Sequence, residues 1–360
     1  MQIGIVGLPF SGKTTLFNTV TKTHLDPDKS GRMKQNVATI KVPDVRLDRL
    51  TDIFHPEKTV NATIEILDMG GLQPGESGGV KFSTGFLASV KTNDALVQVV
   101  RCFKDDSIPH PEGSIDMLRD IRSFETEFIL SDQAIVENRI EKINKQVQKV
   151  NDEALRRELP LLEKSKALLE AGNPLREAAF TPGEQAALRS YQFLSMKPLL
   201  VALNLDETQR GSGPAYLKAV GEMKKGKNTK ALAFSGKIEM ELAELSPGEA
   251  AAFMAEYGIE ESAFNNLIRE AYDLLGLQSF FTVGEDECRA WTVKKGVNAQ
   301  EAAGAIHSDI AEKFIRAEVV HYDDFISHGS FAKAKESGSW RLEGKEYPVM
   351  EGDIISFRHS

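Results

Sequence analysis

The segment GLPFSGKT, from Gly7 to Thr14, has the residue types and the spacing of a phosphate-binding loop. It matches GxxxxGK[ST] and lies between an apolar run, IGIV, and a helix-like stretch, TTLFNTV, as this motif requires. Backbone N–H groups of such a loop and the positive end of the following helix both attract anions. We expect Lys13 to reach the β- and γ-phosphates of a nucleotide and the Thr14 hydroxyl to bind Mg²⁺.

A second candidate is Asp68, which ends the apolar run IEILD, with Gly71 three residues further on. The carboxyl ends of parallel strands meet at one edge of a sheet, so Asp68 is expected to lie near the loop and to hold Mg²⁺ through water. Gly71 could offer its N–H to a γ-phosphate and so couple the following loop to the nucleotide state.

Two more turns follow apolar runs further along the chain. Asn204 and Glu207 have the spacing at which GTPases carry Asn-Lys-x-Asp, but the acid is a glutamate and Leu205 replaces the lysine. The later stretch AFSGKIE resembles the last base-contacting loop of such proteins. Ordinary turns after strands are the alternative interpretation of both segments.

Alternating strand-like and helix-like stretches predict the scaffold for these residues, an α/β fold with a mainly parallel sheet and helices on both faces. From Phe124 onward, apolar residues spaced by four and three predict an antiparallel helical hairpin, which forms an insertion over about 124–195. Short strands and turns near the C-terminus follow the order of a β-grasp module. We therefore divide the chain into a P-loop domain, 1–275, and a β-grasp domain, 278–360.

Composition narrows the class of protein. A net charge of −9 argues against attraction of nucleic acid over the whole surface, although a local basic face could still bind RNA. Cys102 and Cys288 lack the spacing of a zinc site. No apolar stretch approaches the length of a membrane span. We expect a cytoplasmic protein that binds neither membrane nor DNA.

At this point the sequence resembles the YchF family of Obg-like P-loop ATPases. The resemblance spans nearly the whole chain through segments such as GKTTLFN, VPDVRLDRL, ALVQVVRCF, RAWTVKKG, FIRAEVVHYDDF and GDIISFR. It implies that the C-terminal module is a ubiquitin-like TGS domain. It also implies a slow, Mg²⁺-dependent switch that hydrolyses ATP or GTP and contacts the ribosome through ribosomal RNA or protein.

The resemblance also assigns individual residues. The nucleotide-binding positions are Phe10, Ser11, Gly12, Lys13, Thr14 and Thr15; Asp68 and Gly71; Asn204, Leu205 and Glu207; and Ser235, Gly236 and Lys237. Thr14 and Asp68 are the predicted metal ligands. The family carries an apolar residue in place of the catalytic glutamine of other GTPases, and Leu72 fits this pattern. His110 matches the family's histidine with a role in hydrolysis.

Two departures from the family change what we expect. The family's loop reads Pro-Asn-Val-Gly-Lys-Ser, whereas Phe10 and Ser11 stand here in place of Asn-Val. Loss of that asparagine removes an oxygen that related GTPases use for potassium, so we expect no activation by potassium. The first switch, GRMKQNVATIKVPD, is shortened, and Thr39 comes too late to match the usual threonine ligand of Mg²⁺.

Three functions therefore stay open at this point. The first is a slow nucleotide-hydrolysing switch that acts on translation, and the second is a regulatory module that binds nucleotide with little or no turnover. A metabolic phosphotransferase is the third, although no acceptor-binding group of residues is evident. We also expect the C-terminal module to be dispensable for nucleotide binding, because it contains no phosphate-binding element.

Overall fold

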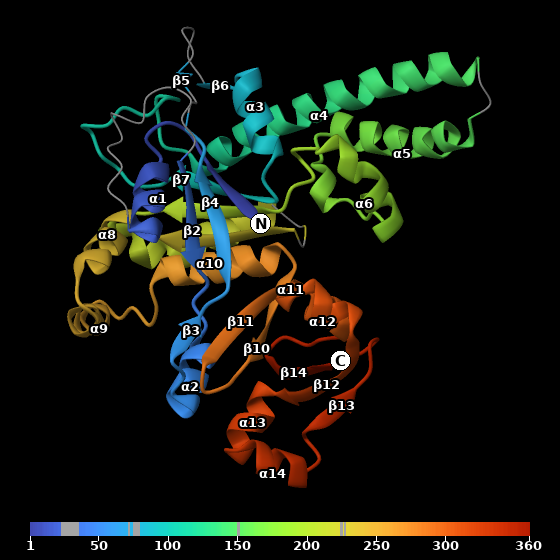
Figure 1. Cartoon of the computed structure of the whole chain (residues 1–360). Helices are drawn as coiled ribbons and strands as arrows, with labels where there is room; N and C mark the ends of the chain where they lie inside the picture. Colours follow the sequence, from blue (N-terminus) through green and yellow to red (C-terminus); the bar gives the residue numbers. More distant parts are fainter. Residues whose placement is uncertain (23–35, 71–72, 75–79, 150–151, 224–225, 227) are drawn as a thin grey trace. The chain divides into compact units, whose positions relative to one another are not determined.

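The computed structural model describes residues 1–22, 36–70, 73–74, 80–149, 152–223, 226 and 228–360 (Figure 1). Contacts within the chain define two compact units: residues 1–38 with 65–274, and residues 39–64 with 275–360. This division differs from a cut near residue 275, because a segment between the phosphate-binding loop and Asp68 packs with the C-terminal elements.

The nucleotide-binding unit is built on a sheet with the strand order β2-β4-β1-β7-β8-β9. The strands are β1 (Gln2–Val6), β2 (Asn36–Lys41), β4 (Thr63–Asp68), β7 (Ala95–Arg101), β8 (Leu199–Asn204) and β9 (Thr229–Phe234). The pairings among β4, β1, β7, β8 and β9 are parallel. Every residue of β7 and β8 is buried, as expected for central strands that are covered on both faces.

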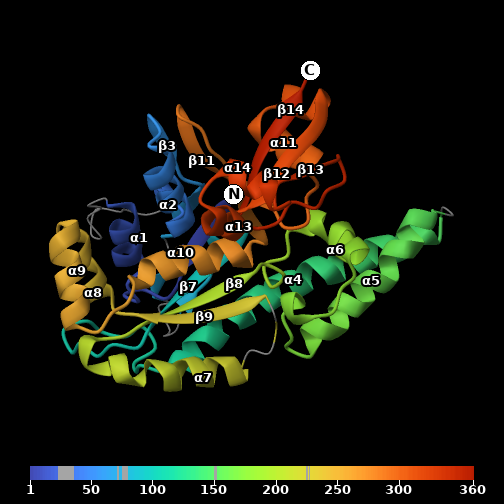
Figure 2. The same cartoon turned by 90° about the horizontal axis from the view of Figure 1, so that it is seen from below.

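Helices cover both faces of this sheet (Figure 2). On one face, α3 (Thr84–Lys91), α4 (Met117–Val147) and α7 (Gly213–Met223) contribute to one apolar core with side chains of β1, β4, β7 and β8. Elsewhere α10 (Ala263–Leu274) contacts β7, β8 and β9, and α1 (Lys13–Thr21) packs against α8 (Gly236–Glu244). The predicted α/β architecture is confirmed.

The helical insertion forms an arm in which α4 and α5 (Glu153–Glu170) run side by side (Figure 1). Its core contains Val136 and Ile143 of α4 and Leu162 of α5, which are fully buried. The smaller helix α6 (Pro182–Leu188) and the short turns η1 (Leu175–Glu177) and η2 (Arg189–Tyr191) complete the arm. No helix in the described ranges is long and apolar enough to cross a bilayer.

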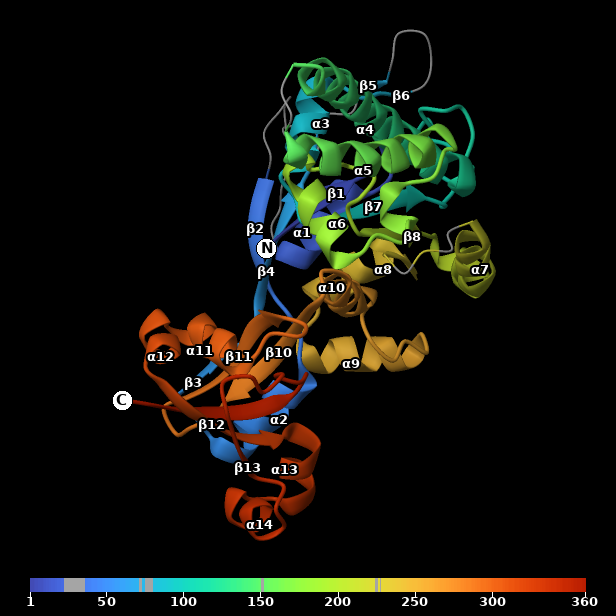
Figure 3. The same ribbon diagram turned by 90° about the vertical axis from the view of Figure 1, so that its right-hand side faces the viewer.

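The second unit has a sheet with the order β13-β12-β14-β10-β11-β3. Its elements are α2 (Val45–Phe54), β3 (Lys58–Val60), β10 (Leu277–Thr282), β11 (Glu287–Lys294), α11 (Ala299–Ile306), α12 (Ser308–Glu312), β12 (Phe314–His321), α13 (Tyr322–His328), α14 (Phe331–Glu336), β13 (Arg341–Glu343) and β14 (Asp353–His359). An antiparallel β10–β11 hairpin and a central parallel β10–β14 pair give the β-grasp arrangement (Figure 3).

Residues 39–64 complete this second unit. Strand β3 extends its sheet by pairing in parallel with β11, and α2 contacts the same strand. Arg46 of α2 forms ion pairs with Asp44 and Glu351 and lies over the ring of Phe281 at 5.2 Å. The segment therefore shares both strand pairing and side-chain contacts with the C-terminal elements.

Candidate functional site

The phosphate-binding loop leaves the carboxyl end of β1 and leads into α1, so its position follows from the strand order. Gly12 caps α1 with φ of 99°, a conformation that side chains rarely adopt. A Cβ atom at this position would lie 2.3 Å from Nδ2 of Asn204. Glycine is therefore required here for two independent reasons, backbone conformation and space.

Lys13 folds back over its own loop. Its Nζ donates a hydrogen bond to the carbonyl oxygen of Leu8 at 2.8 Å. Burial lowers the pKa of Lys13 to about 8, and the nearby Asp68 carboxylate opposes that shift. The contact with Leu8 keeps the ammonium within the loop, where it can neutralise phosphate charge.

Thr14 and Asp68 meet, as predicted, although 53 residues separate them in the chain. The Thr14 hydroxyl donates to Oδ2 of Asp68 at 3.2 Å. Oδ1 of Asp68 is buried and has no hydrogen-bond partner among the residues that the structure describes. Burial raises the pKa of Asp68, while Lys13 and the Thr14 hydrogen bond lower it.

This pair fits a magnesium site. Hydroxyl and carboxylate oxygens are ligands that Mg²⁺ prefers, and in P-loop proteins phosphates and water complete the shell. Among the described residues no group of three or more His, Cys, Asp or Glu could hold a metal by itself. Thr14 and Asp68 would thus hold Mg²⁺ together with a bound nucleotide rather than alone.

Asn204, at the end of β8, joins the phosphate-binding loop to the loop after β9. Its Nδ2 donates to the carbonyl oxygen of Ser11 at 3.1 Å, and its Oδ1 accepts from the N–H of Gly236 at 3.0 Å. The hydroxyls of Ser11 and Ser235 are buried beside these contacts and have no hydrogen-bond partner within the described part of the chain. Gly236 also lies close to α1, since a Cβ there would be 3.5 Å from Thr15 Cγ2.

The predicted base-binding residues are divided between surface and core. Glu207 and Lys237 form an exposed ion pair at 2.9 Å, and the hydrogen bond from Lys237 to Glu207 raises the pKa of this lysine. Leu205 is only 4% exposed, and its N–H donates to the carbonyl oxygen of Phe234 at 2.8 Å. Both the side chain and the N–H of Leu205, a predicted nucleotide-binding position, are therefore engaged within the protein in this structure.

His110 lies in the loop between β7 and α4. Its Nε2 is 3.1 Å from Oδ2 of Asp120, and both side chains are almost fully buried. Its Nδ1 accepts from the N–H of Glu112 at 3.1 Å. The structure thus pairs His110 with a carboxylate that the sequence analysis did not select, because Asp120 resembles any acid in a helical first turn.

Other predicted positions lie outside the described residues. Gly71 and Leu72, which follow Asp68, belong to this group, as do residues 31–35 of the first switch. The structure does place Thr39, which is exposed on β2. Phe10, in the position of the family's asparagine, is 55% exposed and has φ of 62°.

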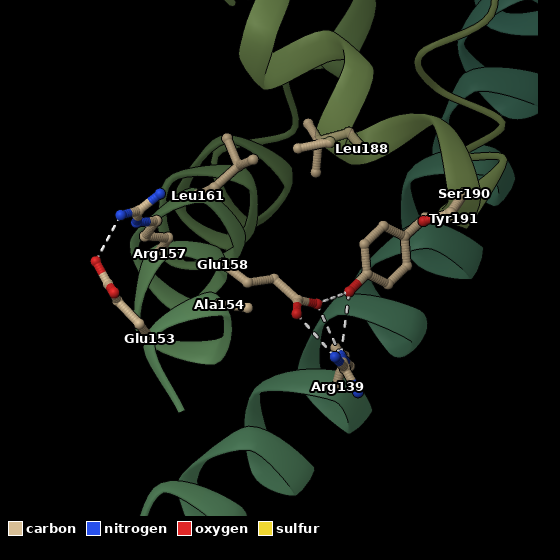
Figure 4. Close-up of a pocket in the computed structure, with 10 residues that line it drawn as sticks. Arg139, Glu153, Ala154, Arg157, Glu158, Leu161, Leu188, Ser190 and Tyr191 are labelled. Carbon is tan, nitrogen blue, oxygen red and sulfur yellow. Dashed lines mark hydrogen bonds and ion pairs between the residues drawn. The ribbon is translucent and has the colours of Figure 1, made fainter. Parts of the chain in front are cut away.

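A separate hollow of about 770 Å³ lies in the helical arm between α4, α5 and η2 (Figure 4). Arg139 and Glu158 pair across it at 2.7 Å, and the Tyr191 hydroxyl bonds to the same carboxylate. Arg157 at its rim pairs with Glu153 at 2.5 Å. These charged groups pair with one another, whereas Oδ1 of Asp68 in the phosphate site has no hydrogen-bond partner in the described ranges.

The parallel sheet, the glycine-capped loop and the Thr14–Asp68 pair define a P-loop NTPase. A model described as 50S ribosome-binding GTPase matches residues 2–157. The model of the YchF GTPase C-terminal domain, described as a protein of unknown function, matches residues 277–360. The first match lies within the predicted P-loop domain, 1–275, and covers part of it, and the second spans the predicted β-grasp domain, 278–360.

Relatives similar over the full length identify the family. The chain is 41% identical to the ribosome-binding ATPase YchF of Bacillus subtilis, over 99% of both chains. It is 40% identical to the protein of the same name from Haemophilus ducreyi, over 99% of this chain and 98% of that one. The solved YchF GTPase of Schizosaccharomyces pombe has a TM-score of 0.87 and 30% identity, covering 99% of this chain and 97% of its own. The chain belongs to the YchF family.

Proposed function

We propose that this protein is an ATP-hydrolysing switch that acts on the ribosome. The observation that carries the proposal is the pairing of Thr14 with Asp68 beside Lys13, which assembles a cation for phosphate and two oxygens for Mg²⁺. Bound Mg²⁺ would neutralise charge that develops on the phosphates during hydrolysis. Lys13 would bind and orient the terminal phosphates, and Thr14 and Asp68 would hold the metal.

We infer that the base site accepts adenine at least as well as guanine. A GTPase uses the acid of Asn-Lys-x-Asp to accept two hydrogen bonds from guanine, and adenine cannot supply them. Here Glu207 has an extra methylene and its carboxylate is paired with Lys237, which competes with a bidentate contact to a base. A site without buried groups that demand guanine loses its main source of discrimination.

Ribosome binding is proposed from the relatives. The Bacillus subtilis and Haemophilus ducreyi proteins are named ribosome-binding ATPases, and the N-terminal match is described in similar terms. A protein that binds nucleotide as a regulatory ligand without turnover is the second candidate. The specific observation in its favour is that both ring nitrogens of His110 have protein partners.

Phosphate release tests the proposal directly. The protein is incubated with saturating MgATP, with and without ribosomes, and free phosphate is followed over time; Lys13→Ala is the matched control. We expect slow release alone and faster release with ribosomes. No release in either condition, with ATP still bound, would eliminate the switch and favour the regulatory module.

A further inference from the structure

The loop that carries His110, residues 102–116, is fixed at both of its ends. At its start the guanidinium of Arg101 donates to the carbonyl oxygens of Asp105 and Ile108, each at 3.1 Å. At its end Arg119 Nη1 donates to the Ser114 hydroxyl at 3.0 Å. His110 is therefore held at a defined place between these two anchors.

Both ring nitrogens of His110 lie against protein groups in this position. Nδ1 accepts from the N–H of Glu112, so in the neutral ring the proton resides on Nε2. Nε2 lies 3.1 Å from Oδ2 of Asp120, with exposed fractions of 5% and 3% for the two side chains. A histidine that orients water needs a free nitrogen within hydrogen-bond reach, so this arrangement is a resting one.

Asp120 is in turn held firmly. Its Oδ1 accepts from Nε and Nη2 of Arg119 at 2.9 and 2.7 Å, and its carbonyl oxygen accepts from Gln98 Nε2 of β7 at 3.3 Å. Burial raises the pKa of Asp120, whereas Arg119 and His110 lower it. Through its carboxylate and its backbone carbonyl oxygen, Asp120 thus links the loop, the first turn of α4 and the central sheet.

We propose that Asp120 is a positioning residue that holds His110 in a resting state, and that separation of this pair switches on hydrolysis. The proposal rests on the proposed function and on the role in hydrolysis that the family resemblance gives to His110, which we take to be the orientation of the attacking water. Because Asp120 lies in the first turn of α4, a helix of 31 residues that forms the arm, a partner that displaces the arm would act on the pair directly. Hydrolysis is thereby made conditional on what the arm contacts.

Asp120→Asn tests the proposal with little change of shape. The new amide oxygen can still accept from Arg119, which leaves the amide N–H₂ facing the Nε2–H of His110, so two donors meet where the ring had faced a carboxylate. We expect the kcat for MgATP without ribosomes to rise about tenfold, since the neutral amide no longer attracts the ring of His110. KM and the Kd for ATP stay unchanged.

Two further variants separate this effect from a structural one. His110→Ala combined with Asp120→Asn removes the gain. Asp132→Asn, the matched control, changes another buried carboxylate of α4, which accepts from the N–H groups of Leu194 and Ser195, and leaves kcat unchanged. Arg119→Gln, at a part-exposed position, raises kcat by a smaller factor and provides a second test if Asp120→Asn does not fold.

Hydrogen exchange of residues 103–116 gives a readout that does not depend on turnover. The proposal predicts faster exchange in Asp120→Asn and unchanged exchange in Asp132→Asn. Ribosomes must first be shown to stimulate wild-type hydrolysis in the same preparation. If the folded Asp120→Asn protein then has the kcat and the hydrogen exchange of wild type, the proposal is overturned. If wild type with ribosomes releases no phosphate, the proposed function itself is contradicted. Failure of the Asp120 proposal and failure of the proposed function therefore give different results.

Discussion

The amide nitrogen of Asn204 donates to the carbonyl oxygen of Ser11 at 3.1 Å, so the end of β8 supports the phosphate-binding loop directly. Oδ1 of the same side chain accepts from the N–H of Gly236. Asn204 is 5% exposed, and its removal would leave both backbone groups buried without partners. One side chain thus couples the loops for phosphate and base.

Asn204→Ala is expected to lower the free energy of unfolding by about 1–3 kcal/mol, the cost of leaving buried polar groups unpaired, and to weaken ATP binding about tenfold. Chemical denaturation and calorimetric titration with MgATP measure the two effects. Asn93→Ala is the control, because Asn93 is equally buried but bonds to carbonyls of α3. Equal ATP affinity in both variants would show that Asn204 does not support the site.

ATP affinity should depend on the protonation of Lys13, whose pKa is lowered to about 8 by burial. Bound phosphates favour the charged ammonium and raise this pKa in the complex. Binding therefore takes up a proton above pH 8, and the association constant falls by up to about tenfold per pH unit there. Titrations with ATP from pH 7 to 10 measure how the association constant depends on pH. Lys237→Ala should retain the wild-type dependence. A flat profile would exclude Lys13 as the titrating group.

ATP should bind at least as tightly as GTP, because the Glu207 carboxylate is paired with Lys237. Glu207→Asp removes one methylene and should recover part of the GTP preference, whereas Glu241→Asp, an exposed acid on α8, should not. We leave Leu205 unchanged, since a lysine there would place a charge in the core. Competition against a fluorescent nucleotide measures both affinities. A wild-type preference for GTP above about tenfold, or 1.4 kcal/mol, contradicts this account.

Removal of residues 275–360 should expose residues 39–64, which pack with them in the second unit. The fully buried Leu47 and Leu50 of α2 and the strand β3 pack within the second unit. Loss of their partners exposes apolar side chains, each worth about 1.5–3 kcal/mol when buried. Limited trypsin digestion should cleave residues 39–64 much faster in the fragment. Cleavage at the full-length rate would contradict this packing.

Those parts of the fold and of the site that depend on local sequence patterns could be predicted from the sequence. The loop from Gly7 to Thr14 and the apolar run that ends at Asp68 predicted a shared site, and the Thr14–Asp68 contact confirms their proximity. The seam of apolar residues after Phe124 likewise predicted the helical arm.

The other features depend on tertiary contacts, which local sequence patterns do not reveal. Leu205 follows a strand as a base-contacting residue would, but side-chain burial and a bond to Phe234 place it in the core. Asp120 gains its partner His110 only when the loop folds back on α4. The strand β3 has three residues, too few for any periodicity to reveal that it extends the C-terminal sheet.

Equilibrium binding of MgATP to wild type and Lys13→Ala tests the central claim most directly. The Nζ of Lys13 donates its hydrogen bond to Leu8 of its own loop, so the variant should remain folded by circular dichroism and thermal unfolding. We predict that wild type binds MgATP and that Lys13→Ala shows no measurable binding. Retention of micromolar ATP affinity in a folded Lys13→Ala protein would contradict the assignment of this loop as the nucleotide site.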